Sequence, residues 1–173
     1  VYEVLPGVER YDTFYLVNDE LSHTLPAGVK ESDYKRVYVG RDDSGQVTGV
    51  AISRGEPGFQ DIVMVIFGYD PVAGTVSGMK ILDSKETPGL GDKIFKDMDF
   101  VDQFFAGRPA PLLGVKKGAG KGQANEIDMI TGATISSKVV IQIINNGIEE
   151  WKPLLDKGIP DGPVDAGTAE VAQ

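Results

Sequence analysis

Apolar and polar residues in the middle of the chain follow the pattern of antiparallel strands. Residues 34–55, YKRVYVGRDDSGQVTGVAISRG, place two strand-like runs on either side of the turn-forming residues DDSG. Residues 59–84 repeat this arrangement, and their first run, DIVMVIFGY, is almost continuously apolar, which is typical of a central strand. The two hairpins predict a mainly antiparallel sheet of about four strands.

Two later segments have the apolar period of a helix. Residues 96–107 predict a short amphipathic helix that ends at its glycine. The apolar side of this helix is expected to hold Met98, Val101, Phe104 and Phe105. A longer pattern begins at Thr134 or Ile135 and continues to about Asp156, with apolar steps of three and four at Val140, Ile144, Ile148, Trp151 and Leu155. We therefore expect an α+β fold in which the sheet packs against a long C-terminal helix and a shorter helix.

The chain of 173 residues, 41% of them hydrophobic, is long enough to bury a core of its own. We expect one domain over residues 1–157. Residues 158–173, GIPDGPVDAGTAEVAQ, are rich in glycine, proline and alanine and only weakly apolar, so we expect a flexible tail there.

Charge and composition narrow the function. The chain has 17 basic and 26 acidic residues and a net charge of −9, which disfavours nucleic acid and anionic membrane surfaces as partners. Because it has no cysteine, disulfides, thiolate-bound metals and a cysteine nucleophile are excluded. The one histidine, His23, is too little for a multi-histidine metal site. We predict neither a metal site nor a catalytic residue.

Two glycine-containing loops are candidates for ligand binding. The basic loop 114–123, GVKKGAGKGQ, lacks the spacing of a phosphate-binding loop, so we interpret it as a solvated turn. In the loop 86–91, ETPGLG, the proline and two glycines prevent regular structure. Leu90 in that loop is either an exposed apolar residue that covers a flat ligand or part of the core, and composition alone does not decide between them.

The segment 128–137, DMITGATISS, stands at the start of the long predicted helix. The first amides of a helix are unpaired and its N-terminus is positive, so an anion is favoured there. Gly132 and Ala133 let a ligand reach the backbone, and Thr134 presents a hydroxyl at the same point. The alternative is ordinary N-capping by Thr131 or Thr134.

Taken together, ETPGLG and DMITGATISS resemble the FMN-binding domain of the RnfG and NqrC subunits, which belong to the Rnf complex and the sodium-pumping NADH:quinone reductase. The pattern of that family is an acidic residue, two free positions, Ser or Thr, and then Gly-Ala-Thr. Residues 128–134 match it without departure. The resemblance extends from about Gly55 to near Leu155.

The resemblance implies that FMN is joined to Thr134 through a phosphoester. A separate flavin transferase of the ApbE type makes this bond from FAD with magnesium. Asp128 is assigned to recognition by the transferase or to capping the loop. The residues expected to bind the cofactor are Phe59, Glu86, Thr87, Pro88, Gly89, Leu90, Gly91, Thr131, Gly132, Ala133, Thr134, Ile135 and Ser136.

Within this set the resemblance also implies individual roles. Leu90 covers one face of the isoalloxazine and Phe59 the other. Glu86 and Thr87 bind the ring edge or fix the loop. The hydroxyls of Thr131 and Ser136 donate to the phosphate.

The implied function is a covalent-FMN electron carrier, RnfG-like rather than NqrC-like because the chain is compact. It is expected to be a redox subunit of a membrane-bound, ion-translocating complex rather than a stand-alone enzyme. Its partners would be the other subunits, at the extracytoplasmic (periplasmic) face of a bacterial or archaeal membrane. In the family an N-terminal membrane helix anchors the domain, and we expect one before Val1.

Two alternatives remain open at this point. The first is a flavinylated FMN-binding domain of another extracytoplasmic reductase or of a respiratory regulator. The second is a non-redox binding or scaffold module in which TGAT is only a helix cap.

Overall fold

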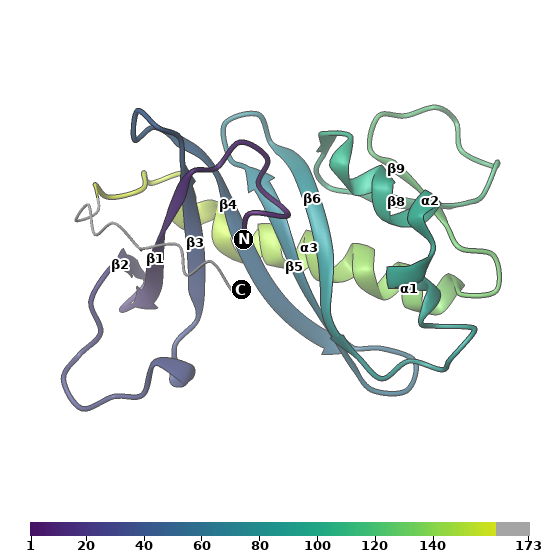
Figure 1. The fold of residues 1–173 in the computed structure, drawn as a ribbon, viewed down its shortest axis with the longest axis horizontal. Coiled ribbons are helices and arrows are strands. Elements are labelled where there is room, and N and C mark those ends of the chain that lie inside the picture. Colours follow the sequence, from purple (N-terminus) through teal and green to yellow (C-terminus); the bar gives the residue numbers. More distant parts are fainter. Residues whose placement is uncertain (162–173) are drawn as a thin grey trace, which may run out of the picture.

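The computed structural model describes residues 1–161, and its largest element is a seven-stranded sheet. The strands lie in the order β2-β1-β3-β4-β5-β6-β7, and each neighbouring pair is antiparallel. Their bounds are β1 Arg10–Val17, β2 Glu20–Ser22, β3 Arg36–Arg41, β4 Val47–Pro57, β5 Ile62–Asp70, β6 Thr75–Ser84 and β7 Arg108–Pro109. Figure 1 shows β2 to β6 side by side in this order.

The remaining elements are short apart from the last helix. A single 3-10 turn, η1, covers Glu31–Asp33. After β6 the chain forms α1 (Lys93–Lys96), α2 (Met98–Val101) and η2 (Asp102–Phe105). The strands β8 (Leu113–Lys116) and β9 (Glu126–Met129) pair in parallel as a second small sheet, and α3 covers Thr134–Leu155.

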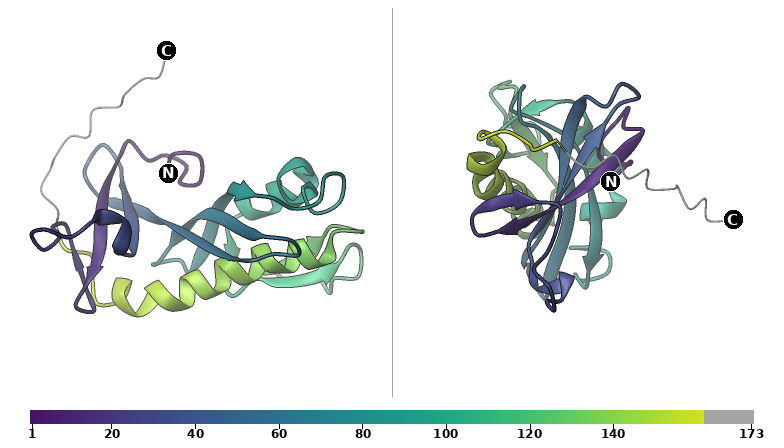
Figure 2. Two further views of the ribbon diagram at one scale, coloured as in Figure 1. Left: turned by 90° about the horizontal axis from the view of Figure 1, so that it is seen from below. Right: turned by 90° about the vertical axis from the view of Figure 1, so that its left-hand side faces the viewer.

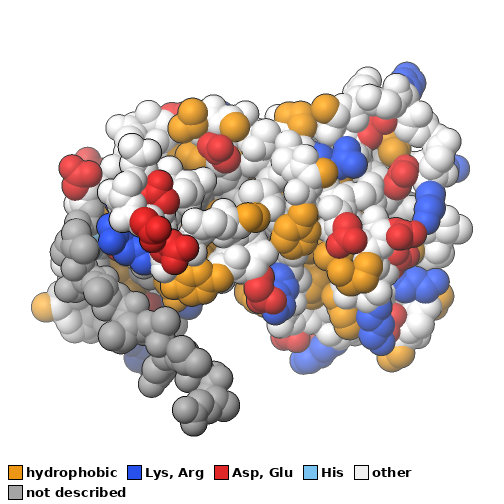
Figure 3. Space-filling model, turned by 45° about the horizontal axis from the view of Figure 1, so that its top comes forward, with side chains coloured by type: hydrophobic (Ala, Val, Ile, Leu, Met, Phe, Trp, Pro, Cys, Tyr) orange, Lys and Arg blue, Asp and Glu red, His pale blue; other side chains and the backbone are white. Residues whose placement is uncertain are grey.

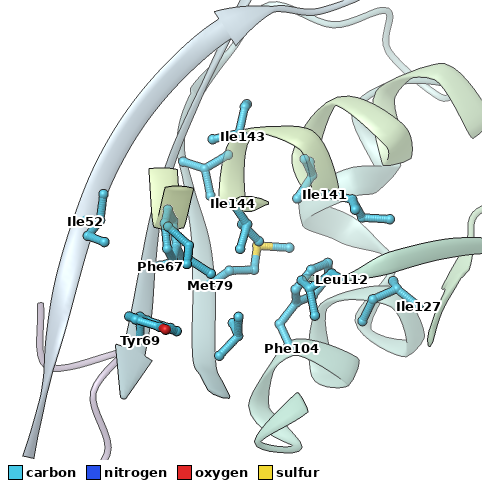
Figure 4. Close-up of a cluster of buried hydrophobic side chains, with 14 of the residues drawn as sticks. Ile52, Phe67, Tyr69, Met79, Phe104, Leu112, Ile127, Ile141, Ile143 and Ile144 are labelled. Atoms are coloured by element: carbon cyan, nitrogen blue, oxygen red, sulfur yellow. The ribbon is translucent and has the colours of Figure 1, made fainter. Parts of the chain in front are cut away.

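The helix α3 runs along one face of the large sheet and packs on β4 and β5 (Figures 1 and 2). Its residues at core spacing, Val140, Ile144, Ile148, Trp151 and Leu155, are all buried, as the sequence predicts. Gly147 lets the helix approach closely, because a Cβ there would lie 2.7 Å from the Phe67 ring. Figure 4 shows Ile143 and Ile144 from α3 beside Phe67 and Met79 from the sheet.

The opposite face of the sheet is partly covered by the first residues of the chain. Val4, Leu5 and Val8 pack there against Ala51 and Ile66 in a separate buried cluster. The hydroxyl of Ser77 donates a hydrogen bond of 2.8 Å to the Val4 carbonyl. Because β5 is covered on both faces, its almost continuous apolar sequence is explained, and its predicted central position is confirmed.

The prediction of about four strands is wrong in number. The four strands of the two hairpins are present as β3 to β6, but β1, β2 and β7 extend the sheet on both sides. Phe14 is the only fully buried residue of β1, so this strand carries little apolar alternation. The predicted α+β class, with a mainly antiparallel sheet and a long C-terminal helix, is confirmed.

The predicted helix over 96–107 is also wrong in detail. Asp97 adopts an extended conformation between α1 and α2, and its carboxylate accepts a hydrogen bond from the Phe100 amide. The helix is therefore broken into short turns. Phe100 and Phe104 are buried, whereas Met98 and Phe105, which we expected on the apolar side, are exposed.

The expected tail, 158–173, lies mostly outside the described residues. Residues 158–161 follow α3 without regular structure. Within residues 1–161 no helix has the length and apolar character needed to cross a bilayer.

The packing of α3 on the sheet gives a prediction about stability. Ile144→Ala should lower the free energy of unfolding by about 2–5 kcal/mol, because it removes a fully buried side chain and leaves a cavity. The matched control is Gln142→Ala, an exposed position of the same helix, with an expected change below about 0.5 kcal/mol. Urea unfolding measures both. Equal effects of the two substitutions would contradict this packing.

Candidate functional site

Three segments that are distant in the sequence meet at one end of the large sheet. They are the turn 58–61 between β4 and β5, the loop 85–92 after β6, and the start of α3. The strands alternate in direction, so the end of β4 and the end of β6 lie at the same edge. The segments enclose a pocket of about 360 Å³. Its lining residues are Phe59, Glu86, Thr87, Leu90, Gly91, Gly132, Ala133, Thr134, Ile135 and Ser136.

The start of α3 forms one wall of this pocket and has no side-chain cap. Ala133 is the N-cap residue, and no side-chain hydrogen bond is made there, so the predicted alternative of capping by Thr131 or Thr134 is wrong. Within residues 1–161 the amides of Thr134, Ile135 and Ser136 donate no hydrogen bond. Three free amides at the positive end of a 22-residue helix favour an anion beside the exposed Thr134 hydroxyl.

The turn before α3 is fixed from inside. Gly132 has a φ of 82°, a conformation that glycine adopts without steric cost. The hydroxyl of Ser137 accepts a hydrogen bond of 3.1 Å from the Ile130 amide and donates one of 2.8 Å to the Ala133 carbonyl. Ser137 therefore holds the turn and does not line the pocket.

Glu86 connects the three segments. Its carboxylate is buried and accepts a hydrogen bond of 2.6 Å from the Ser136 hydroxyl and one of 3.1 Å from the Gln60 amide. Of the two roles expected for Glu86, these bonds match the fixing of the loop. The Ser136 proton is used in this bond, so its expected donation to a phosphate is not compatible with the observed geometry.

The mouth of the pocket carries large apolar side chains. Phe59 is 63% exposed, Leu90 is 53% exposed and Ile135 is 55% exposed, although each lines the pocket. The question of where Leu90 points is thus decided in favour of exposure. Exposed apolar side chains gathered around a hollow are typical of ligand-binding sites. Pro88 and Gly89 lie on the same loop but do not line the pocket.

An ion pair stabilises the loop 85–92 at its far end. Lys96 donates a hydrogen bond of 2.6 Å to Asp92, which is 5% exposed. The Lys96 ammonium holds the pKa of the Asp92 carboxyl below its ordinary value. Asp92 is absent from the residues predicted from the sequence, although its position directly after the second glycine of the motif was a possible signal.

Asp128 and Thr131 line a different hollow, on the other side of the Gly132 turn. This hollow has a volume of about 950 Å³ and lies between α1–η2 and β9. It is lined by both basic and acidic side chains, among them Lys93, Lys117 and Asp102. On the face drawn in Figure 3, side chains of both signs also lie next to one another.

Gln103 holds the beginning of the motif. Its side-chain carbonyl accepts a hydrogen bond of 2.7 Å from the Asp128 amide, and its NH₂ group donates one of 3.1 Å to the Asp128 carbonyl. The side-chain amide thus takes the place of a neighbouring strand at β9. Gln103 is also absent from the predicted residues, and no signal in the sequence connects it with Asp128.

The basic glycine loop binds an anion that belongs to the chain itself. The buried carboxylate of Glu126 accepts hydrogen bonds from the amides of Lys121, Gly122 and Gln123, at 3.0, 3.0 and 3.3 Å. The loop therefore folds around Glu126. This contact accounts for its glycines without an external phosphate.

Comparison with known proteins adds family information to this geometry. A model of the FMN-binding domain family matches residues 58–149. This range includes all ten residues that line the pocket. It also contains both sequence motifs on which the resemblance to a flavin-binding domain was based.

Three curated relatives are similar to the chain over much of its length. The RnfG subunit of the Na(+)-translocating ferredoxin:NAD(+) oxidoreductase complex of Acetobacterium woodii is 36% identical over 88% of this chain. The RnfG subunits of the ion-translocating oxidoreductase complexes of Methanosarcina acetivorans and Escherichia coli K12 are 30% and 31% identical over 65% and 82% of it. The matches span 72%, 56% and 66% of these relatives' own lengths.

Two solved structures share the fold. Shewanella oneidensis NqrC superposes with a TM-score of 0.67 at 17% identity, covering 86% of this chain and 84% of that one. The NqrC subunit of the Na(+)-translocating NADH-quinone reductase of Parabacteroides distasonis gives 0.64 at 21% identity, with 89% and 80% covered. At these identities the two structures support the fold alone.

The packing around Glu86 predicts that the glycine of the loop cannot be enlarged. In Gly91→Ala the new methyl group would lie 2.6 Å from the Glu86 carboxylate and 2.7 Å from its Cβ, so the loop must shift. We expect a loss of about 1–3 kcal/mol in the free energy of unfolding, measured by urea unfolding. Lys85→Ala, an exposed position in the same segment, serves as the control with a change below about 0.5 kcal/mol. A Gly91→Ala protein as stable as the control would refute the close packing.

Proposed function

The chain belongs to the family of FMN-binding domains, and from this premise we propose that it carries one FMN in the pocket as an electron-transfer subunit of an ion-translocating oxidoreductase complex. The observation that supports this most is the meeting of an uncapped helix start with exposed apolar side chains around one pocket. The helix start suits a phosphate, and the apolar walls suit a flat ring. The similarity to RnfG subunits of such complexes favours an RnfG-like role.

We propose further that the FMN is covalent, through a phosphoester between its phosphate and the Thr134 hydroxyl. Thr134 is the exposed first residue of α3, so its hydroxyl is accessible beside the free amides. A phosphodiester keeps one negative charge, which the helix N-terminus stabilises by about 0.3–1 kcal/mol. A flavin transferase of the ApbE type would form the ester, with Asp128 as part of its recognition.

The apolar residues at the mouth are the proposed contacts of the ring. Leu90 and Phe59 lie on loops on either side of the pocket opening, and Ile135 lies at the helix start. Stacking on an aromatic side chain such as Phe59 contributes about 0.5–1.5 kcal/mol beyond burial. The flavin supplies the redox chemistry, and the protein holds it and sets its environment.

Two further parts of the proposal concern the cellular setting. We propose that the domain acts at the extracytoplasmic face of the membrane, anchored by a helix upstream of Val1. The other subunits of the complex would deliver and accept its electrons. A covalent bond suits this place, because it prevents loss of the cofactor where no pool of free FMN replaces it.

The covalent assignment predicts the effect of removing one hydroxyl. Thr134→Val, coexpressed with the transferase, should carry no flavin, because valine has the shape of threonine without its nucleophilic oxygen. Thr134→Ser is the matched control and should retain attachment. Intact mass and fluorescence on a denaturing gel measure the result. Gel-stable flavin on Thr134→Val would show that the attachment site lies elsewhere.

The ring contact predicts a separate effect for the loop. Leu90→Ala should leave attachment intact and shift the flavin absorption spectrum or its midpoint potential, because the exposed side chain that covers the ring is lost. The change is measured on purified, flavinylated protein. Val72→Ala, at a 96% exposed position in the turn between β5 and β6, is the control. Identical spectra and potentials for Leu90→Ala and the wild type would remove Leu90 from the ring contacts.

A further inference from the structure

Glu86 places a negative charge in the wall of the pocket. The residue is 5% exposed, and both of its carboxylate oxygens accept hydrogen bonds, from the Ser136 hydroxyl and the Gln60 amide. Both donors are neutral. Within residues 1–161 Glu86 forms no ion pair, so its charge is not balanced by a cation.

The cations that lie near Glu86 along the chain are paired with other acids. The Lys85 ammonium lies 3.5 Å from the Asp61 carboxylate. The Lys96 ammonium lies 2.6 Å from the Asp92 carboxylate. Neither lysine is therefore positioned to neutralise Glu86.

Backbone encloses the Glu86 carboxylate on two sides. A Cβ at Gly58 would lie 2.5 Å from one carboxylate oxygen, and a Cβ at Gly91 would lie 2.6 Å from the other. Close backbone contact leaves little room for water to screen the charge. Charges act more strongly on one another in such a site than in solvent.

We propose that the charge of Glu86 lowers the midpoint potential of the flavin held in this pocket. This inference rests on the proposed function, since it assumes that FMN occupies the pocket. Each electron that a partner subunit transfers to the flavin adds negative charge beside the carboxylate, and repulsion opposes that transfer. The hydrogen bond from Ser136 partly offsets the charge of Glu86, so Ser136 moderates the effect.

The chain offers a matched control for this proposal. Glu126 is also a buried carboxylate held by neutral donors, but it lies at the start of β9 and does not line the pocket. Glu126→Gln removes the same kind of charge from the same protein. Its effect on the flavin should be small compared with that of Glu86→Gln.

The experiment is a spectroelectrochemical titration of the flavinylated domain at neutral pH. Glu86→Gln keeps the shape of the side chain and removes its charge, and it should favour the reduced flavin at least tenfold, about 30 mV upward for a two-electron couple. Ser136→Ala leaves the charge with one donor fewer and should shift the potential downward. Glu126→Gln should leave it near that of the wild type. Opposite shifts for the first two variants are expected from charge and not from a general loosening of the pocket.

The outcomes separate this inference from the proposed function. A wild-type protein that takes no flavin from the transferase would contradict the proposed function itself. If the wild type is flavinylated, an unchanged or lowered potential in Glu86→Gln overturns the inference, as does an equal shift in Glu126→Gln. If Glu86→Gln does not fold, as judged by circular dichroism, Ser136→Ala decides alone. A downward shift in Ser136→Ala then supports the inference, and any other result overturns it.

Discussion

The hydrogen bonds of the Glu86 carboxylate are the interaction on which the geometry of the pocket depends. A buried carboxylate is stable only when other donors replace its contacts with water. Here the donors come from the turn 58–61 and from the first turn of α3, while Glu86 itself belongs to the loop 85–92. Hydrogen bonds to charged groups contribute about 1.5–3 kcal/mol each, so the three segments cannot move independently without a large loss. One side chain thereby fixes every wall of the pocket relative to the others.

The helix α3 supplies the other constraint, because it leaves its first amides free. Omitting an N-cap costs a helix about 0.5–2 kcal/mol. Burial of a single isoleucine or valine contributes about 1.5–3 kcal/mol, and α3 buries Val140, Ile143, Ile144 and Ile148. The core contacts of the helix therefore outweigh the missing cap. The sheet stabilises the helix from its middle to its end, and the start remains available for a ligand.

The sequence predicts those features that depend on local patterns. Both hairpins and α3 follow from apolar periodicity, and the two motifs of the pocket follow from their residues. The contacts that join the motifs are not local: Glu86 meets Gln60 and Ser136 across 26 and 50 positions of the chain. Nothing in either segment specifies its partner. The strands β1 and β7 were missed for a related reason, since they gain stability by pairing with an existing sheet and carry little pattern of their own.

The small residues before Thr134 are explained by the fold as much as by a ligand. Gly132 is required by its positive φ, and Ala133 is 6% exposed and belongs to the core, where a larger side chain would have to displace its neighbours. Neither residue needs a cofactor to account for it. The exposed hydroxyl of Thr134 is different, because it caps nothing and the amides beside it are free. The part of the motif that packing leaves unexplained is therefore the part that an anionic ligand would use.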